Sequence, residues 1–254
     1  MTQGIILAAG LGSRLKEVTA TIPKSLIRVN GKPVLERNIE FMREAGFDRV
    51  VLVVGYMAER FTYLSERYRD LDLRLVRNDQ YATSNTVSSL FAARRFFDRD
   101  AFIVTADIYL AENPYLTYSG EGCFYVLRPD AKLSKPEWIA HLDDGMHIRS
   151  VDQCGFSGHS YTGISHWTTE GLSLLERKLM ALDWDDPAER ARYWDELMLP
   201  DLGSFDLRAK VLASDGEVYE FDDMGDIEKL KRETGLHVEF QEGSPFDPTE
   251  SCAV

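Results

Sequence analysis

The stretch LAAGLGSRLKEVTATIPK, residues 7–24, continues an apolar run that begins near residue 3. The run at 3–9 predicts a short buried strand, because it is mostly apolar and stops at a glycine. Gly10 and Gly12 come next, and glycine lets backbone N–H groups curl around a phosphate and approach it closely. The sequence therefore predicts a phosphate-binding turn after the first strand.

Two cations accompany these glycines in an acidic chain. Arg14 offers a planar fork that can hold phosphate oxygens in pairs, and Lys24, just after Pro23, offers a compact charge for a second phosphate. A dinucleotide fingerprint is incomplete because Leu15 stands in place of its third glycine, and the chain has no G-x-x-x-x-G-K-[ST] motif. A simple strand-to-helix turn is the alternative, and the two cations argue against it.

Strand and helix patterns alternate along the first 110 residues. The run at 50–54 is apolar at every position, as in a strand covered on both faces. Such alternation predicts a parallel sheet with right-handed crossovers, in which ligands bind at the carboxyl ends of the strands. The expected helices are 33–46, 57–68 and 84–94, and the further strands are 73–76 and 102–106.

Beyond residue 120 the pattern changes to short alternating runs, which predict antiparallel or mixed strands. The expected fold class is therefore α/β: a Rossmann-like mixed, mainly parallel sheet flanked by helices, with an elaborated second half. The expected strands of that half are 123–127, 138–142, 147–151, 161–166 and 218–221, and its helices are 168–182, 187–198 and 225–234.

The composition excludes several classes of function. With 29 Lys+Arg against 42 Asp+Glu the formal net charge is −13, so nucleic acid and anionic membrane surfaces are not expected partners. No apolar run approaches the roughly 20 residues of a membrane-spanning helix, and the N-terminus lacks a basic signal-peptide start, so a cytoplasmic protein is expected. Three widely spaced cysteines fit a reducing compartment and exclude a disulfide framework.

The stretch at 7–24, continued by SLIRVNGKPVLERNIE at 25–40, resembles the nucleotidyltransferases, whose signature is G-x-G-x-R, a spacer and P-K. Within that family the chain is most similar to cytidylyltransferases that act on phosphocholine, phosphoethanolamine or 2-aminoethylphosphonate. The resemblance implies the fold of nucleotide-diphospho-sugar transferases. The closer likeness is carried by NDQYATSN at 78–85, YWDELM at 193–198, VYEFDDMGDIEKL at 218–230, Asp107 and Trp138.

We expect one nucleotidyltransferase domain at residues 1–242. Its nucleotide-binding half is expected at 1–110 and its acceptor-binding half at 111–242. The segment 243–254 holds two prolines and little apolar content, so it is expected to be a disordered tail.

Two carboxylates stand at the ends of separate predicted strands. Asp107 follows the strand at 102–106 and Asp222 follows the strand at 218–221, so both can reach a Mg²⁺ that bridges nucleotide phosphates. The resemblance implies the same metal role for both. Asp223 can either bind the metal or cap the helix that begins after it.

The resemblance also implies where the nucleotide lies. The base is expected against the backbone of the first loop, from Leu7 through Ala8 and Ala9 to Gly10, with Gly12 in the phosphate turn. Asn85 can read a cytosine edge with its amide or cap the helix that starts at Thr86, and both interpretations stand. The candidate contacts to base and ribose are Asn78, Tyr81, Asn85 and Thr86.

All four tryptophans lie in the second half, where the family binds its acceptor. Aromatic faces with carboxylates nearby suit an ammonium group. Trp167 and Trp184 fit ordinary core positions better than a binding site. The expected acceptor contacts are Trp138, Tyr193, Trp194, Asp195 and Glu196.

Together these residues predict a Mg²⁺-dependent transfer of CMP from CTP to a small amine-bearing phosphate or phosphonate, with release of pyrophosphate. Arg14 and Lys24 are the expected catalytic cations. A sugar-1-phosphate nucleotidylyltransferase is the nearest alternative, although the hexapeptide repeat often attached to such enzymes is absent. A catalytically silent nucleotide-sensing subunit is the alternative of another class, and the presence of both cations together with Asp107 and Asp222 argues against it.

Overall fold

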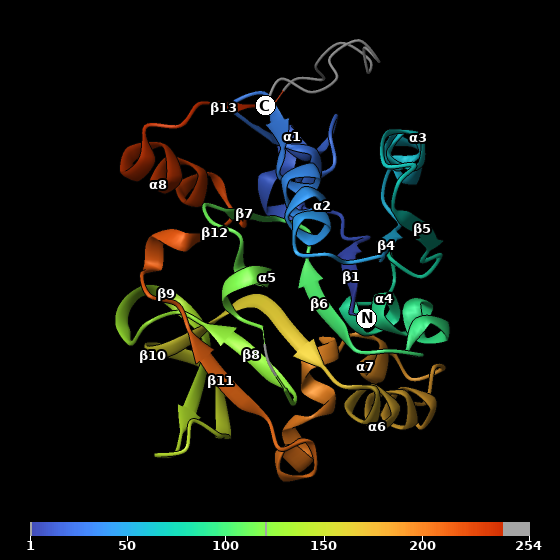
Figure 1. The fold of residues 1–254 in the computed structure, drawn as a ribbon, viewed down its shortest axis with the longest axis vertical. Helices are drawn as coiled ribbons and strands as arrows, with labels where there is room; N and C mark the ends of the chain where they lie inside the picture. Colours follow the sequence, from blue (N-terminus) through green and yellow to red (C-terminus); the bar gives the residue numbers. More distant parts are fainter. Residues whose placement is uncertain (1, 120, 241–254) are drawn as a thin grey trace.

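The computed structural model describes residues 2–119 and 121–240. Its centre is an eight-stranded sheet in the order β11-β8-β10-β6-β1-β4-β5, with β9 paired to β10 outside that row (Figure 1). Four neighbouring strands are parallel, so their carboxyl ends share one edge, as the strand–helix alternation predicted. They are β1 (Gln3–Ala8), β4 (Arg49–Val54), β5 (Asp72–Arg77) and β6 (Ala101–Thr105).

The second half completes the same sheet with antiparallel pairing. β10 (Ile148–Trp167) runs antiparallel to β6 and to β8 (Phe124–Leu127), and β11 (Arg208–Val211) lies parallel to β8 at the edge. The strands expected at 147–151 and 161–166 are the two ends of β10, which pairs with β9 (Ala131–Leu142) through several register shifts. The glycines of the intervening segment concealed this continuity.

Helices cover both faces of the sheet. Because side chains alternate along a strand, Ile6 and Leu52 face one apolar layer while Ile5 and Val51 face the other. The first layer is covered by α2 (Val34–Glu44), α3 (Leu64–Arg67) and α5 (Pro114–Thr117). The second is covered by α4 (Thr86–Ala93) and α6 (Thr169–Met180), on the opposite side of the sheet from α2 and α3 in Figure 1.

A small two-stranded ribbon beside the main sheet joins the segment around residue 220 to the end of β6. β7 (Ile108–Leu110) pairs antiparallel with β12 (Val218–Glu220), and the Phe221 N–H donates to the Asp107 carbonyl at 2.9 Å. The residues just after β12 thereby come to lie beside the end of β6. The remaining helices are α1 (Lys16–Thr19), α7 (Pro187–Arg190) and α8 (Met224–Thr234), and the remaining strands are β2 (Arg28–Val29), β3 (Lys32–Pro33) and β13 (Val238–Glu239).

Two expected helices are shorter than predicted. The stripe at 57–68 divides into a 3₁₀ turn at Ala58–Phe61 and α3, and Met57, which is left-handed, precedes the turn and is not part of a helix. The segment 187–198 divides into α7 and a 3₁₀ turn at Trp194–Leu197, with an extended Tyr193 between them. Among the described residues no helix is long and apolar enough to cross a membrane. The tail at 243–254 lies outside the described residues.

Candidate active site

The glycine loop has a backbone that requires glycine. Gly12 has φ +64°, and a Cβ placed there would lie 2.7 Å from Cγ2 of Thr19, whose hydroxyl donates to the Gly12 carbonyl at 3.0 Å. A Cβ placed on the exposed Gly10 would meet no atom of the described residues within 4 Å. The loop is therefore closed at Gly12 and open to a ligand at Gly10.

The two predicted cations and the two predicted carboxylates form one ion cluster. Nζ of Lys24 lies 2.6 Å from Oδ2 of Asp107 and 2.8 Å from Oδ1 of Asp222. Arg14 reaches the other oxygen of Asp222 at 2.5 Å. The Lys24 side chain is only 13% exposed and that of Arg14 is 64% exposed, so Lys24 is fixed between the carboxylates whereas Arg14 can turn toward a ligand.

The ion cluster is charged in its resting form. Burial acts to lower the pKa of Lys24, but the charges of Asp107 and Asp222 outweigh it and raise that pKa above its usual value. Burial likewise acts to raise the pKa of Asp222, and the Lys24 and Arg14 charges hold it below the usual range. Lys24 is therefore a permanent cation beside the glycine loop.

A third carboxylate, Glu220, joins the cluster and was missed by the sequence reasoning. One carboxylate oxygen from each of Asp107, Glu220 and Asp222 lies within 4.8 Å of the others. Burial and then the charges of Asp107 and Asp222 raise the pKa of Glu220 to about 8. Glu220 stands two residues before Asp222, and the period of a strand places such residues on the same face, which is the signal that could have found it.

This donor set fits a divalent cation. Oδ1 of Asp107 is buried and has no hydrogen-bond partner among the described residues, which is rare for a carboxylate oxygen. Mg²⁺ prefers oxygen ligands, and a divalent charge would favour the ionised form of Glu220. Asp107, Glu220 and Asp222 are therefore the residues that would hold it.

Asp223 serves the adjacent helix instead. It is the N-cap of α8, where its side chain accepts hydrogen bonds from the N–H groups of Gly225 and Asp226. Asp226 in turn accepts from the backbone of Asp222 and Asp223, and it pairs with Lys135 of β9 at 2.8 Å. The capping interpretation of Asp223 is the one that its contacts support.

The first strand and the loop after β5 meet where the nucleotide was expected. Leu7, Ala8 and Ala9 are buried at the end of β1. Gly55 separates this end from Tyr81: a Cβ on Gly55 would lie 2.9 Å from the Ala9 carbonyl oxygen and 2.7 Å from Cβ of Tyr81. Only glycine allows that approach, so Tyr81 lies beside the open part of the glycine loop.

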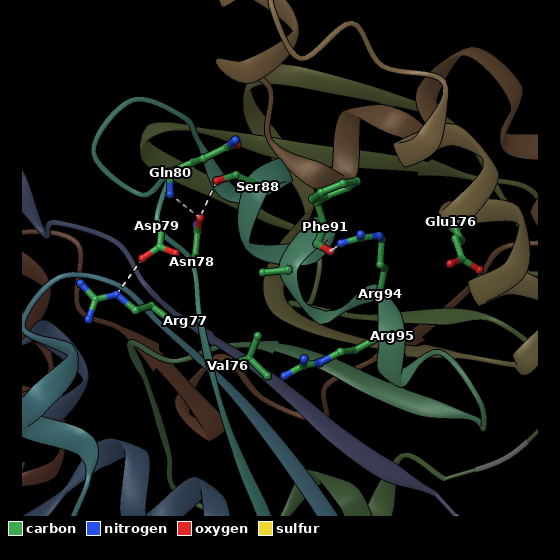
Figure 2. A pocket seen from close by; sticks show the side chains of 11 residues that line it. Val76, Arg77, Asn78, Asp79, Gln80, Ser88, Phe91, Arg94, Arg95 and Glu176 are labelled. Carbon is green, nitrogen blue, oxygen red and sulfur yellow. Dashed lines mark hydrogen bonds and ion pairs between the residues drawn. The ribbon is translucent and has the colours of Figure 1, made fainter.

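Asn78 is turned away from this surface. It is 4% exposed, its amide donates to the hydroxyls of Ser88 and Ser89, and its oxygen accepts from the Gln80 N–H. It lines a hollow of about 660 Å³, and no residue of the ion cluster lines that hollow. Figure 2 shows it next to Ser88 and Gln80, across from Phe91. Its packing does not support the predicted base contact for Asn78.

Asn85 is a helix cap. Its side-chain oxygen accepts from the Thr86 N–H at 2.8 Å, and its amide donates to the Ala191 carbonyl at 3.1 Å. The Thr86 hydroxyl accepts from the Trp194 N–H at 3.0 Å. Of the two interpretations of Asn85, the structure therefore shows the cap, and both residues connect α4 to the second half.

Three aromatic rings gather in the second half. Trp138 of β9 lies 6.0 Å, centroid to centroid, from both Tyr161 of β10 and Tyr193. Tyr193 is 42% exposed, so this group of rings is open to solvent. Tyr161 was not predicted, because nothing in its sequence neighbourhood distinguishes it from other strand tyrosines. These three side chains are called the aromatic cluster below.

Carboxylates adjoin the aromatic cluster. Asp195 accepts a hydrogen bond of 2.5 Å from the buried Tyr125 hydroxyl, and burial raises the pKa of Asp195 to about 7. The Tyr125 ring also lies 4.6 Å, centroid to centroid, from the Tyr161 ring, so Asp195 adjoins the aromatic cluster through Tyr125. Glu196 accepts from the Gln153 amide at 3.4 Å. The predicted acceptor residues at 193–196 therefore lie on one stretch of chain, which the Tyr193 ring joins to Trp138.

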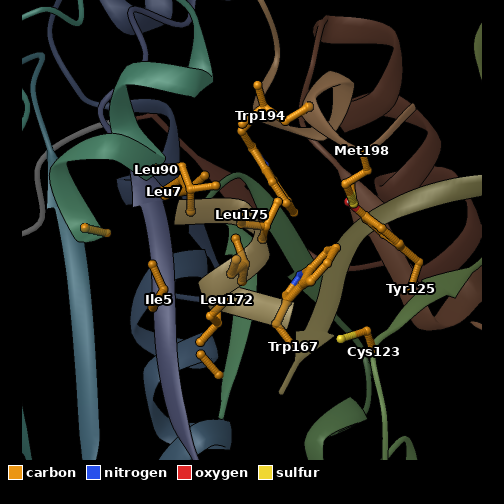
Figure 3. Close-up of a cluster of buried hydrophobic side chains, with 14 of the residues drawn as sticks. Ile5, Leu7, Leu90, Cys123, Tyr125, Trp167, Leu172, Leu175, Trp194 and Met198 are labelled. Atoms are coloured by element: carbon orange, nitrogen blue, oxygen red, sulfur yellow. The ribbon is translucent and has the colours of Figure 1, made fainter. Parts of the chain in front are cut away.

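Trp194 belongs to the hydrophobic core. Its ring is 4% exposed and packs edge-on against Trp167 at 5.7 Å and parallel to Tyr125 at 6.2 Å. Figure 3 shows it among Leu175, Trp167 and Tyr125. The burial of this ring in the core beside α4 and α6 therefore does not support the predicted acceptor contact of Trp194. Trp167 is core as expected, and Trp184 packs against Phe91 at 4.4 Å.

Comparison with known proteins agrees with this geometry. The family model of the MobA-like NTP transferase domain matches residues 4–119. The chain is 32% identical to the choline-phosphate cytidylyltransferase of Haemophilus influenzae over 228 residues, which cover 89% of this chain and 94% of the relative. It is 32% identical to the 2-aminoethylphosphonate cytidylyltransferase of Lancefieldella rimae over 208 residues, which cover 81% and 82%.

A solved structure shares the whole fold. The CTP:phosphocholine cytidylyltransferase from Streptococcus pneumoniae superposes with a TM-score of 0.82 at 29% identity, over 91% of this chain and 98% of the other. The expected mixed, mainly parallel sheet flanked by helices is thereby confirmed, as is the resemblance to the nucleotidyltransferases.

Proposed function

Because the chain belongs to the nucleotidyltransferase family, we propose that it transfers CMP from CTP to a small phosphate or phosphonate that carries an amine. An acceptor oxygen attacks the α-phosphorus of CTP, a new P–O bond forms, and the bond to the bridging oxygen breaks so that pyrophosphate leaves. The observation that carries this proposal is the ion cluster of Lys24, Arg14, Asp107 and Asp222 beside an open glycine loop.

In this proposal Lys24 and Arg14 stabilise the negative charge on the nucleotide phosphates. Lys24 is held in place before substrate arrives, so its charge needs little reorganisation as negative charge grows on the transferring phosphate. Arg14 is exposed and can leave Asp222 to grip phosphate oxygens in pairs. The open backbone at Gly10 can approach the phosphates from the other side.

Magnesium completes the proposed site. Bound by Asp107, Glu220 and Asp222, Mg²⁺ would neutralise charge on the nucleotide phosphates and favour departure of pyrophosphate. The carboxylates that would bind it also hold Lys24, so the metal and the lysine share one set of positioning groups.

The amine of the acceptor is proposed to bind at the aromatic cluster. Ring faces attract a cation, and Asp195 adds a carboxylate next to them. Approach of an ammonium group would favour the ionised form of Asp195. The names of the relatives from Haemophilus influenzae and Lancefieldella rimae, which specify choline phosphate and 2-aminoethylphosphonate, support an acceptor of this kind.

Trp138→Ala is expected to raise the acceptor KM about 30-fold, because a desolvated cation–π contact contributes about 2 kcal/mol. The KM for CTP should barely change, since none of the three rings belongs to the glycine loop or to the ion cluster. The measurement is steady-state pyrophosphate release with phosphocholine and with 2-aminoethylphosphonate. Trp184→Ala, in which a tryptophan packed on Phe91 is lost, is the matched control. An unchanged acceptor KM in Trp138→Ala would contradict the assignment.

A further inference from the structure

The N-terminus of α4 is joined to a segment of the second half by a row of hydrogen bonds. The Asn85 N–H donates to the Arg190 carbonyl at 2.8 Å, and the Asn85 amide donates to the Ala191 carbonyl at 3.1 Å. The Val87 N–H reaches the Arg192 carbonyl at 3.4 Å. Three consecutive carbonyls are thus bound by one helix end, which is why the chain at 190–193 does not continue as a helix.

Thr86 fixes the end of the same segment. Its hydroxyl accepts from the Trp194 N–H at 3.0 Å, while the Trp194 ring is buried against Trp167 and Tyr125. The segment 190–194 is therefore held by α4 on one side and by the core on the other. Tyr193 lies inside it with an exposed ring, and Asp195 follows it directly.

We propose that Asn85 and Thr86 are positioning residues for the acceptor: they hold the segment 190–194 so that the Tyr193 ring stands against Trp138, with Asp195 next along the chain. This inference rests on the proposed function, because it takes the aromatic cluster as the acceptor subsite. It assigns Asn85 a task different from reading cytosine. Its oxygen caps α4 and its amide bridges to Ala191, so both ends of the side chain are engaged within the protein.

The chain from Tyr81 to Thr86 contacts both the glycine-loop side and the segment 190–194. α4 follows the loop that carries Tyr81, and Tyr81 lies against the end of β1 at the glycine loop. One short stretch of chain therefore contacts the nucleotide side at Tyr81 and the acceptor segment at Asn85 and Thr86. A loss at Asn85 should consequently affect the acceptor, whereas a loss at Tyr81 should affect CTP.

The test separates the two roles of the Asn85 side chain. Asn85→Asp retains the cap, since aspartate caps helices as well as asparagine, but it places an oxygen instead of a donor next to the Ala191 carbonyl. We expect the KM for phosphocholine and for 2-aminoethylphosphonate to rise about 10-fold and the KM for CTP to stay within about twofold. A raised KM for CTP, or lost discrimination between CTP and UTP, with an unchanged acceptor KM would overturn the proposal.

Thr86 supplies an independent pair of variants. Thr86→Val removes the acceptor for the Trp194 N–H and should raise the acceptor KM, whereas Thr86→Ser retains the hydroxyl and should restore it. If Thr86→Val and Thr86→Ser have the same acceptor KM as the unmodified protein, the proposal fails. The two Thr86 variants therefore test the positioning role even if Asn85→Asp does not fold.

Asn113→Asp is the matched control for loss of a bridging amide. Asn113 caps α5, and its amide donates to the Phe41 carbonyl at 2.9 Å, away from the acceptor segment. This variant should lower the melting temperature without changing the acceptor KM. If the unmodified protein turns over neither acceptor with CTP, the proposed function itself fails. Turnover in the unmodified protein with unchanged acceptor KM in the Asn85 and Thr86 variants refutes the positioning role alone.

Discussion

Asp107→Asn and Asp222→Asn are each expected to lower kcat by on the order of 10³-fold while the protein remains folded. Each change removes a charge that holds Lys24 and an oxygen proposed to bind Mg²⁺. Oδ1 of Asp107 has no hydrogen-bond partner among the described residues, so it is available to a cation. Asp107→Asn would therefore weaken a group that is free to bind the metal. Asparagine is nearly isosteric with aspartate, which limits the effect on packing.

The measurement is kcat over a Mg²⁺ titration, with circular dichroism to verify the fold. Asp223→Asn is the control, because Asp223 caps α8 and asparagine serves equally well as a cap. Its kcat should remain within about threefold of that of the unmodified protein. Undiminished turnover of Asp107→Asn at limiting Mg²⁺ would refute the metal assignment.

Lys24→Ala is expected to lower kcat by about 10²–10³-fold, the usual loss when one fixed electrostatic donor is removed from an active site. Its charge should act most strongly as negative charge accumulates on the α-phosphate, whereas binding of CTP is proposed to be shared among Arg14, the loop backbone and the metal. The KM for CTP should therefore change much less than kcat. Loss of the counter-ion between Asp107 and Asp222 should also reduce thermal stability.

Lys32→Ala provides the comparison for Lys24→Ala. Lys32 pairs with Glu40 at 2.5 Å and its side chain is 45% exposed, so it is a surface lysine with a single carboxylate partner. Its loss should affect neither kcat nor KM. If Lys24→Ala had a normal kcat and lost activity only through a higher KM for CTP, Lys24 would be a binding group and not a catalytic one.

The parallel half of the fold was predictable because its signals are local. A short run that is apolar at every position is typical of a strand covered on both faces, and the residues at 50–54 are part of β4, which is buried throughout. Pro33 and Gly46 delimited the helix expected at 33–46, and α2 begins and ends beside them. β10 (Ile148–Trp167) was predicted as two strands, because local composition does not show that register shifts allow a strand to continue through glycines.

The candidate site was predictable where a residue's role follows from its place at the end of a strand. Asp107 and Asp222 are of that kind, and the structure brings them to the same ammonium group. The buried position of the Trp194 ring and the division of the helix expected at 187–198 were not predictable, because contacts between residues far apart in the sequence determine both. The carbonyls at 190–192 bond to α4 instead of continuing a helix, and the Trp194 ring is drawn into the core between Trp167 and Tyr125.

Pyrophosphate release by the purified protein, measured with each of the four ribonucleoside triphosphates against a panel of acceptors, tests the proposed function most directly. The panel contains phosphocholine, phosphoethanolamine, 2-aminoethylphosphonate and glucose 1-phosphate, each with Mg²⁺ and with EDTA. We expect release with CTP and an amine-bearing acceptor, and its loss in EDTA. A preference for glucose 1-phosphate, or for a nucleotide other than CTP, would contradict the account.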